Sequence, residues 1–169
     1  TLCRSSAASD VYKRQEQQVS FKAAITIKNR FIDKVRNLTN DKIIQLSDKE
    51  LQSIGISFRK AAYIKNVFKY FKENSFDFLS ASNQEVIDEL IKIKGIGLWS
   101  SEMFLMFVLM RIDIFSKGDL ALMNSIKINY KIDIKDDSKL NTLVDSWSPY
   151  KSVASLLLWK SIEEKYFFT

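Results

Sequence analysis

The sequence predicts an all-α fold, a multi-helix bundle that contains a helix-hairpin-helix motif. Apolar residues recur at helical spacing through most of the chain, and no alternating, strand-like pattern is longer than residues 131–135. One proline and four glycines among 169 residues leave few places for hairpin turns. With 46% hydrophobic residues, the chain is long enough to bury one sizeable core.

The first half of the chain predicts three helices whose starts can be recognised. From Val19 onward, apolar residues recur at helical spacing as far as Phe31. Ser47 precedes a predicted helix over 48–54, and Ser57 precedes a long basic helix over 58–72. A serine side chain at such a position can accept a hydrogen bond from the first turn, so both serines are predicted N-caps.

The second half predicts two helices around a glycine turn and two more after it. Asn83 is the predicted N-cap of a helix that runs to Ile91. The apolar stretch 99–110 carries Glu102 and is too short to span a membrane, which indicates a buried helix. Asp119 stands as the N-cap of a helix over 120–130, and a final helix follows Trp147.

The glycine turn in the second half of the chain has the composition of an anion-binding site. Glycine at Gly95 and Gly97 lets the backbone adopt positive φ and brings two N–H groups close to a bulky anion. The helix that starts at the turn directs its positive end the same way, which suits a DNA phosphate. Two glycines between helices are also typical of a tight connection with no ligand, and spacing alone does not decide between these interpretations.

Charge and composition restrict the function further. Lys and Arg number 26 against 20 Asp and Glu, and the net charge of +6 suits a polyanionic partner, but by itself it is about equally compatible with ordinary surface lysine. The absence of histidine excludes an imidazole base and His-ligated metal sites. Cys3 is the only cysteine, which excludes an internal disulfide and a four-cysteine iron–sulfur site and indicates a reducing, intracellular setting.

From Glu16 to the C-terminus, the chain resembles the helix-hairpin-helix DNA glycosylase superfamily, and within it the alkyladenine (3-methyladenine) glycosylase branch. The similar blocks follow one another in the family's order: 16–20, 55–61, 90–110, 115–120, 147–152 and 158–159. One departure is Lys94, where the family usually has a proline; a lysine loosens the turn but adds a cation near the phosphate.

The resemblance implies a monofunctional DNA glycosylase that excises alkylated purines in base excision repair. Asp119 matches the catalytic carboxylate, which would stabilise positive charge at the sugar C1′ and orient water. Trp99 occupies the position where bifunctional members carry a nucleophilic lysine, so no Schiff base is expected. Trp99 and Tyr150 would line a pocket whose aromatic faces favour a cationic base, whereas Trp159 is expected to pack in the core.

The resemblance also implies double-stranded DNA with alkylated bases as the partner, read by base flipping. Gly95, Ile96, Gly97 and Lys94 would hold a phosphate, with Arg59, Lys60 and Lys92 as further candidates, and Gln18 matches the wedge that fills the emptied stack. No metal ligand set and no cofactor are expected, except a monovalent cation among hairpin carbonyls. We expect a monomer without membrane association, intracellular and associated with the nucleoid.

Residues 1–15 lack periodicity and are expected to be a non-native or disordered tail before a glycosylase domain over 16–169. Family members carry an upstream portion, so the chain is expected to be truncated at its N-terminus. Two alternatives stay open: a helix-hairpin-helix module that binds DNA without catalysis, and a glycosylase for oxidised or mispaired bases. Trp99 and the missing cluster cysteines count against the second.

Overall fold

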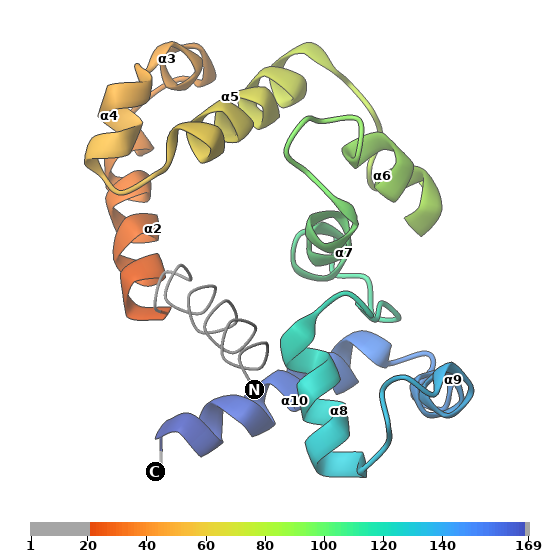
Figure 1. Cartoon of the computed structure of the whole chain (residues 1–169). Coiled ribbons are helices and arrows are strands. Elements are labelled where there is room, and N and C mark those ends of the chain that lie inside the picture. The colour runs from red at the N-terminus through yellow and green to blue at the C-terminus, as the bar shows by residue number, and fades with distance from the viewer. Residues whose placement is uncertain (1–20, 168–169) are drawn as a thin grey trace, which may run out of the picture. The chain divides into compact units, whose positions relative to one another are not determined.

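The structure, a computed structural model, describes residues 21–167 and the side chains of residues 23–162. Every regular element in this part of the chain is a helix, which confirms the all-α prediction (Figure 1). None of these helices is long and apolar enough to cross a membrane. In chain order they are α2 (Phe21–Val35), α3 (Asn40–Gln45), α4 (Asp48–Ser53), α5 (Phe58–Glu73), α6 (Asn83–Leu90), α7 (Leu98–Phe107), α8 (Leu120–Tyr130), α9 (Asp137–Asp145) and α10 (Lys151–Phe167).

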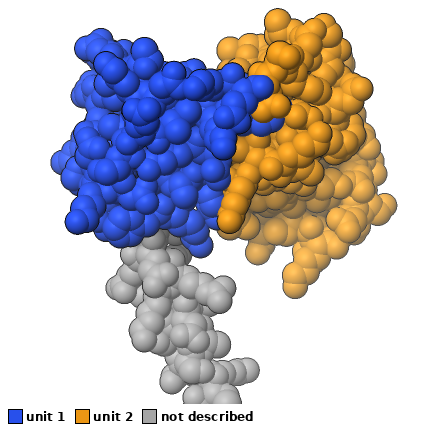
Figure 2. Space-filling view, turned by 90° about the horizontal axis from the view of Figure 1, so that it is seen from above, with its two compact units in different colours: residues 1–73 blue, residues 74–169 orange. Residues whose placement is uncertain are grey.

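The helices fall into two compact units, which Figure 2 colours separately. Unit 1 extends to Glu73 and contains α2 to α5, and unit 2 begins at Asn74 and contains α6 to α10. The glycine hairpin and Asp119, the two sequence features with the clearest functional interpretation, both lie in unit 2. Gln18 and the predicted tail over 1–15 lie outside the described residues.

Unit 1 begins its helices where the sequence places them. The Ser47 hydroxyl accepts a hydrogen bond from Glu50 N–H, and the Glu50 carboxylate accepts one from Ser47 N–H, which makes a complete capping box for α4. The Ser57 hydroxyl accepts from Lys60 N–H at the start of α5. The core of the unit gathers on Leu51, Ile56 and Ala61, against which Ile27, Phe31, Leu46, Ile54 and Ile64 pack.

The turn between α4 and α5 needs its glycine. Gly55 has φ of +102°, a conformation that side chains with a Cβ rarely adopt. A Cβ added there would also lie 2.8 Å from Ile27 Cγ1. Gly55 therefore serves the packing of α2 on this turn.

Unit 2 builds its largest core where α8, α9 and α10 meet. Leu122, Ile126, Leu140, Val144 and Leu158 are its buried members. The fully buried Ser125 hydroxyl of α8 donates to the Leu158 carbonyl of α10 at 2.8 Å, so the two helices are joined by a polar contact within an apolar interface. This contact fixes the part of α10 that immediately precedes Trp159.

One local prediction for unit 2 is wrong. The N-cap of α6 is Ser82, which forms a capping box with Glu85, and Asn83 is the first helical residue. The short alternating segment over 131–135 is a loop that starts with Lys131 in the left-handed conformation, φ +54°. Its alternating pattern arises because Ile132 and Ile134 both pack on the core without a partner strand.

Candidate functional site

The glycine hairpin connects α6 and α7 and is closed by main-chain hydrogen bonds. Ile96 N–H donates to the carbonyl of the buried Ile93 at 2.9 Å, and Gly95 has φ of +112°. Gly97 is the N-cap of α7 with φ −115° and ψ −178°, which is extended backbone that any residue adopts. The prediction of positive φ is therefore right for Gly95 and wrong for Gly97.

Gly97 leaves open space beside the first turn of α7. A Cβ added at this residue would meet no atom within 4 Å, and no side chain caps α7. The first N–H groups of a helix have no partner within the helix, so an N-cap without a side chain leaves them open to a ligand. The neighbouring Lys92 and Lys94 are both exposed, and Lys92 forms an ion pair with Glu89 at 2.6 Å.

Asp119 is the centre of a group of three hydrogen-bond donors. It caps α8 through Leu122 N–H, which donates to Oδ1 at 2.9 Å. The indole of Trp99 donates to Oδ2 at 2.8 Å, and the indole of Trp159 donates to Oδ1 at 3.2 Å. The residue is 8% exposed, so both carboxylate oxygens are fixed in a largely buried site.

These donors decide the charge of Asp119. Burial opposes ionisation and raises the pKa of the carboxyl, but hydrogen bonds from Leu122 N–H and from the two indoles outweigh burial. The pKa of Asp119 therefore lies below the usual range of an aspartate. The side chain is a fixed anion at neutral pH, as a group that must face a developing cation should be.

Three helices supply this arrangement. Trp99 lies on the first turn of α7, Asp119 begins α8, and Trp159 lies on α10. The ring of Trp99 is 51% exposed although its N–H is held. The ring of Trp159 stacks on Phe107, with 5.9 Å between centroids and 27° between planes.

The expectation that Trp159 packs in the core is confirmed, but it is incomplete. Its ring does pack against the core of unit 2, but its N–H donates to Asp119. The sequence holds no signal for this contact, because 40 residues separate the two partners and nothing local fixes where the indole points.

The start of α10 is tied to the segment that precedes Asp119. Asp113 accepts hydrogen bonds from the Ser148 hydroxyl and from Lys151 N–H, just after the cis Ser148–Pro149 bond. The buried Ser152 hydroxyl donates to the Arg111 carbonyl at 2.7 Å. These contacts set where α10 begins, and so help to set where Trp159 arrives two turns later.

A second carboxylate lies beside Asp119. Glu102 of α7 accepts a hydrogen bond from the hydroxyl of the fully buried Ser116. Burial raises the pKa of Glu102, the Ser116 hydrogen bond opposes that shift, and the charge of Asp119 adds to it. Glu102 is not among the site residues predicted from the sequence, although a carboxylate in the most apolar stretch of the chain, three residues after Trp99, is a signal for one.

The other predicted site residues are not joined to this group in the described structure. Tyr150 precedes α10, donates through its N–H to the Trp147 carbonyl at 2.7 Å, and is 60% exposed. Its assignment to the pocket wall stays a prediction. Arg59 and Lys60 belong to α5 in unit 1, and Gln18 lies outside the described residues.

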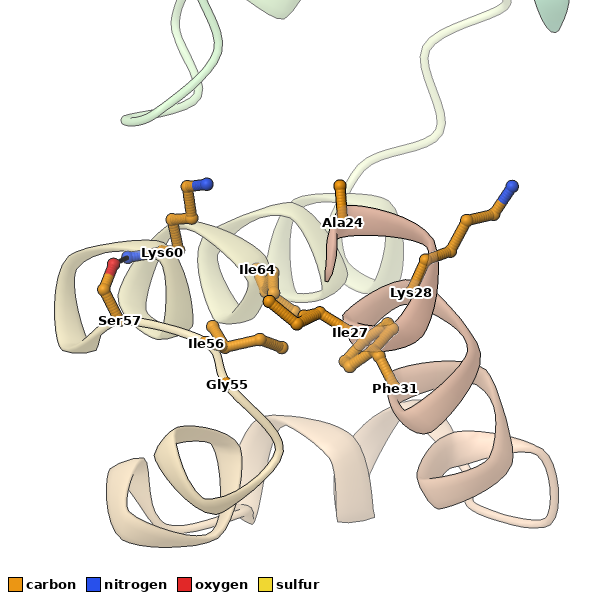
Figure 3. A pocket seen from close by; sticks show the side chains of 9 residues that line it. All are labelled: Ala24, Ile27, Lys28, Phe31, Gly55, Ile56, Ser57, Lys60 and Ile64. Atoms are coloured by element: carbon orange, nitrogen blue, oxygen red, sulfur yellow. Dashed lines mark hydrogen bonds between the residues drawn. The ribbon is translucent and has the colours of Figure 1, made fainter. Parts of the chain in front are cut away.

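Unit 1 contains a pocket of its own. Figure 3 shows Ile27, Phe31, Ile56 and Ile64 grouped at its apolar centre, while the side chains of Lys28 and Lys60 extend away from it. The wall also includes Gly55, whose φ and packing were described above. None of the described residues that line this pocket carries a carboxylate, so these residues offer no group equivalent to Asp119.

We expect Asp119→Asn to lower the free energy of unfolding at pH 7 by about 1–3 kcal/mol, because an amide offers one acceptor oxygen where the carboxylate offers two to its three donors. A carboxyl with a lowered folded-state pKa stabilises above its unfolded pKa and loses that contribution as pH falls through the folded value. The difference between parent and variant should therefore shrink on acidification below about pH 4. Urea unfolding across this range measures it, and a difference that stays constant with pH would contradict the assignment.

Comparison with known proteins shows the family to which this chain is similar. The model of the HhH-GPD superfamily of base excision DNA repair proteins matches residues 15–149. The DNA-3-methyladenine glycosylase of Saccharomyces cerevisiae is 30% identical over 85% of this chain and 62% of its own length. A Bacillus subtilis relative is also 30% identical, and the chain spans 55% of it. The chain thus covers little more than half the length of these relatives.

Two solved structures are similar over most of the chain. The DNA-3-methyladenine glycosidase of Bacillus halodurans has a TM-score of 0.69 and 38% identity, over 86% of this chain and 70% of that one. The Schizosaccharomyces pombe 3-methyladenine DNA glycosylase, in complex with abasic DNA, has a TM-score of 0.76 and 28% identity, over 88% of this chain and 76% of that one. By fold, by the extent of the family match and by identity to these relatives, the chain belongs to the HhH-GPD superfamily of base excision DNA repair proteins.

Proposed function

We propose that the chain is a monofunctional DNA glycosylase that removes alkylated purines of the 3-methyladenine type from double-stranded DNA. The observation that carries the proposal is the buried Asp119 carboxylate, held ionised by Leu122 N–H and by two indole N–H groups. The names of the relatives support the same activity. We expect the protein to act as an intracellular monomer on nucleoid DNA.

The reaction uses Asp119 without any imidazole. The oxygen of a water molecule forms a bond to C1′ while the N-glycosidic bond breaks, and the departing purine takes the bonding electron pair. An alkylated purine that carries positive charge leaves as a neutral base and so requires no strong general acid. Asp119 stabilises the positive charge that develops at the sugar, and the proton lost by the water passes to the carboxylate or to solvent.

In this proposal, the hairpin binds a phosphate of the DNA backbone. The N–H groups at the start of α7 and the cation of Lys94 meet a phosphate without reading a base. A monovalent cation, held by hairpin carbonyls, would strengthen this phosphate binding. The Ile93 carbonyl suits it, because that oxygen accepts one hydrogen bond, from Ile96 N–H, and has a second lone pair.

We expect Asp119→Asn to lower the single-turnover rate of base release from methylated duplex DNA by on the order of 100-fold or more, because the variant loses the charge that faces the transition state. Release is measured as free base from DNA treated with a methylating agent. The matched control is Asp136→Asn, the same substitution at the N-cap of α9, where the side chain accepts from Lys139 N–H. That control should keep the parent's rate.

Both variants should bind duplex DNA as the parent does, which separates chemistry from binding. Borohydride should trap no adduct, and strand breaks should follow only alkali, because Trp99 cannot form a Schiff base. If the parent binds DNA but releases no base, the chain is a binding module and the catalytic proposal is wrong. A trapped adduct would reject monofunctional chemistry.

Variants of Trp99 give a second test, because they separate the contribution of its aromatic ring from that of its N–H donor. Trp99→Phe keeps an aromatic face but removes the donor to Asp119, so its rate should fall by a similar factor on cationic and neutral lesions. Trp99→Ala removes both and should lose a further ~2- to 30-fold on 3-methyladenine, which corresponds to a cation–π energy of ~0.5–2 kcal/mol. Release of 8-oxoguanine, a neutral base, provides the comparison. Equal losses on both bases would contradict selection by charge.

The hairpin gives a third test. Gly97→Val should reduce duplex binding at least about tenfold while the unfolding free energy changes little, because the added side chain enters open space in front of the helix N–H groups. Gly97→Ser should stabilise α7 by a few tenths of a kcal/mol as a better N-cap, yet also weaken binding.

Binding by the parent should fall with a log–log salt slope of several units, because phosphate contacts release counterions. Fluorescence anisotropy over a salt series measures both this salt slope and the loss of affinity in the Gly97 variants. If the Gly97 variants bind as tightly as the parent, the hairpin is only a turn.

A further inference from the structure

The catalytic proposal leaves a partly buried carboxylate of unit 2, that of Glu102, without a role. Glu102 lies three residues after Trp99 on α7, and residues so spaced lie on the same face of a helix. Its carboxylate accepts the Ser116 hydroxyl at 2.5 Å, and Ser116 is fully buried. A carboxylate that is partly removed from water loses some of its hydration, so a well-placed hydrogen bond to a fully buried hydroxyl calls for an explanation.

Ser116 belongs to the short loop that leads into α8, and it is bonded to Asp119 directly. The Asp119 N–H donates to the Ser116 carbonyl at 3.2 Å. Gly118 lies between them, and a Cβ there would meet nothing within 4 Å, so side-chain packing does not hold that point of the loop. Lys117 is held by an exposed hydrogen bond to Asn141, so the buried side-chain contact nearest to Asp119 on its N-terminal side is that of the Ser116 hydroxyl.

Helix α7 thus holds the aspartate loop at two places. Trp99 donates a hydrogen bond to the side chain of Asp119. Three residues further along α7, Glu102 accepts a hydrogen bond from Ser116, which precedes Asp119 by three residues. The first contact orients the carboxylate, and the second fixes the backbone that carries it. Without the Glu102 contact, the backbone before Asp119 would lose its buried attachment to α7, and the side-chain donors to Asp119 would have to hold the carboxylate alone.

We propose that Glu102 is a positioning residue that, through Ser116, holds the Asp119 carboxylate in its reactive place. The inference rests on the proposed glycosylase function for its kinetic consequence, but its structural content does not depend on activity. A displacement of Asp119 by about 1 Å is enough to lower a rate on the order of 100-fold, because the carboxylate must face C1′ and water at once.

Three variants separate geometry from charge. Glu102→Ala removes the acceptor, Ser116→Ala removes the donor, and Glu102→Gln keeps an acceptor oxygen while it removes the charge. We expect either alanine variant to lower the single-turnover rate of base release by about 10- to 100-fold with duplex affinity unchanged. The rate of Glu102→Gln should stay within about threefold of the parent's rate. The double alanine variant should be no slower than the slower single variant, because the two single substitutions remove the same hydrogen bond.

A second readout needs no activity. The chain has three tryptophans, so the indole N–H signals of Trp99 and Trp159 can be assigned by NMR. Glu102→Ala and Ser116→Ala should speed hydrogen exchange at the Trp99 indole about tenfold, because the loop that holds its acceptor is released. Glu102→Gln should not. The matched control is Asp88→Ala on α6, an exposed carboxylate bonded to Gln84, which should change neither rate nor exchange.

The outcomes distinguish this inference from the proposed function. If the parent releases no base, the proposed function fails, and the indole exchange alone decides whether Glu102 positions the loop. If the alanine variants leave both exchange and rate unchanged, the positioning role is wrong. If Glu102→Gln is as impaired as Glu102→Ala, the charge rather than the hydrogen bond matters, and the inference is also overturned.

Discussion

The arrangement of unit 2 around its candidate site depends on one interaction, the binding of both Asp119 oxygens by donors from three helices. An ionised carboxylate in a buried place is costly unless donors replace the lost water, and here Leu122 N–H and the indoles of Trp99 and Trp159 replace it. The same donors that stabilise the anion also fix its direction. A catalytic carboxylate needs both properties, and one set of contacts supplies them.

This interaction places requirements on distant parts of the chain. Trp159 reaches Asp119 only if α10 starts in the right place, and Asp113 and Ser152 fasten that start to the segment before the aspartate loop. The Ser125 hydroxyl joins α8 to α10 one residue before Trp159. Polar contacts of buried serines therefore bring together the three helices whose side chains meet at one carboxylate.

Much of the fold could be predicted from the sequence because its signals are local. Ser47 and Ser57 lie where N-caps should lie, and the structure confirms both helix starts. The error at Asn83 came from two adjacent residues that both favour caps. Glu85 lies three residues after Ser82, so the capping-box pattern could have decided between them.

The candidate site could be predicted only where one residue carries the signal. Asp119 has a helix start, and the hairpin has its glycines, but the contact from Trp159 depends on how helices pack across 40 residues. The Glu102 and Ser116 pair depends in the same way on which face α7 turns toward the loop. Periodicity identifies such faces as buried without saying what they meet.

The two hairpin glycines differ in a way that bears on how sequence variants of this protein would be judged. Gly95 is needed by the backbone itself, at φ +112°, whereas Gly97 has an ordinary conformation with empty space beside it. A survey that scores cellular abundance would count changes at Gly95 as damaging and changes at Gly97 as harmless. Under the proposed function, a variant of the second kind would accumulate to normal levels while its defect became visible only when the genome was challenged.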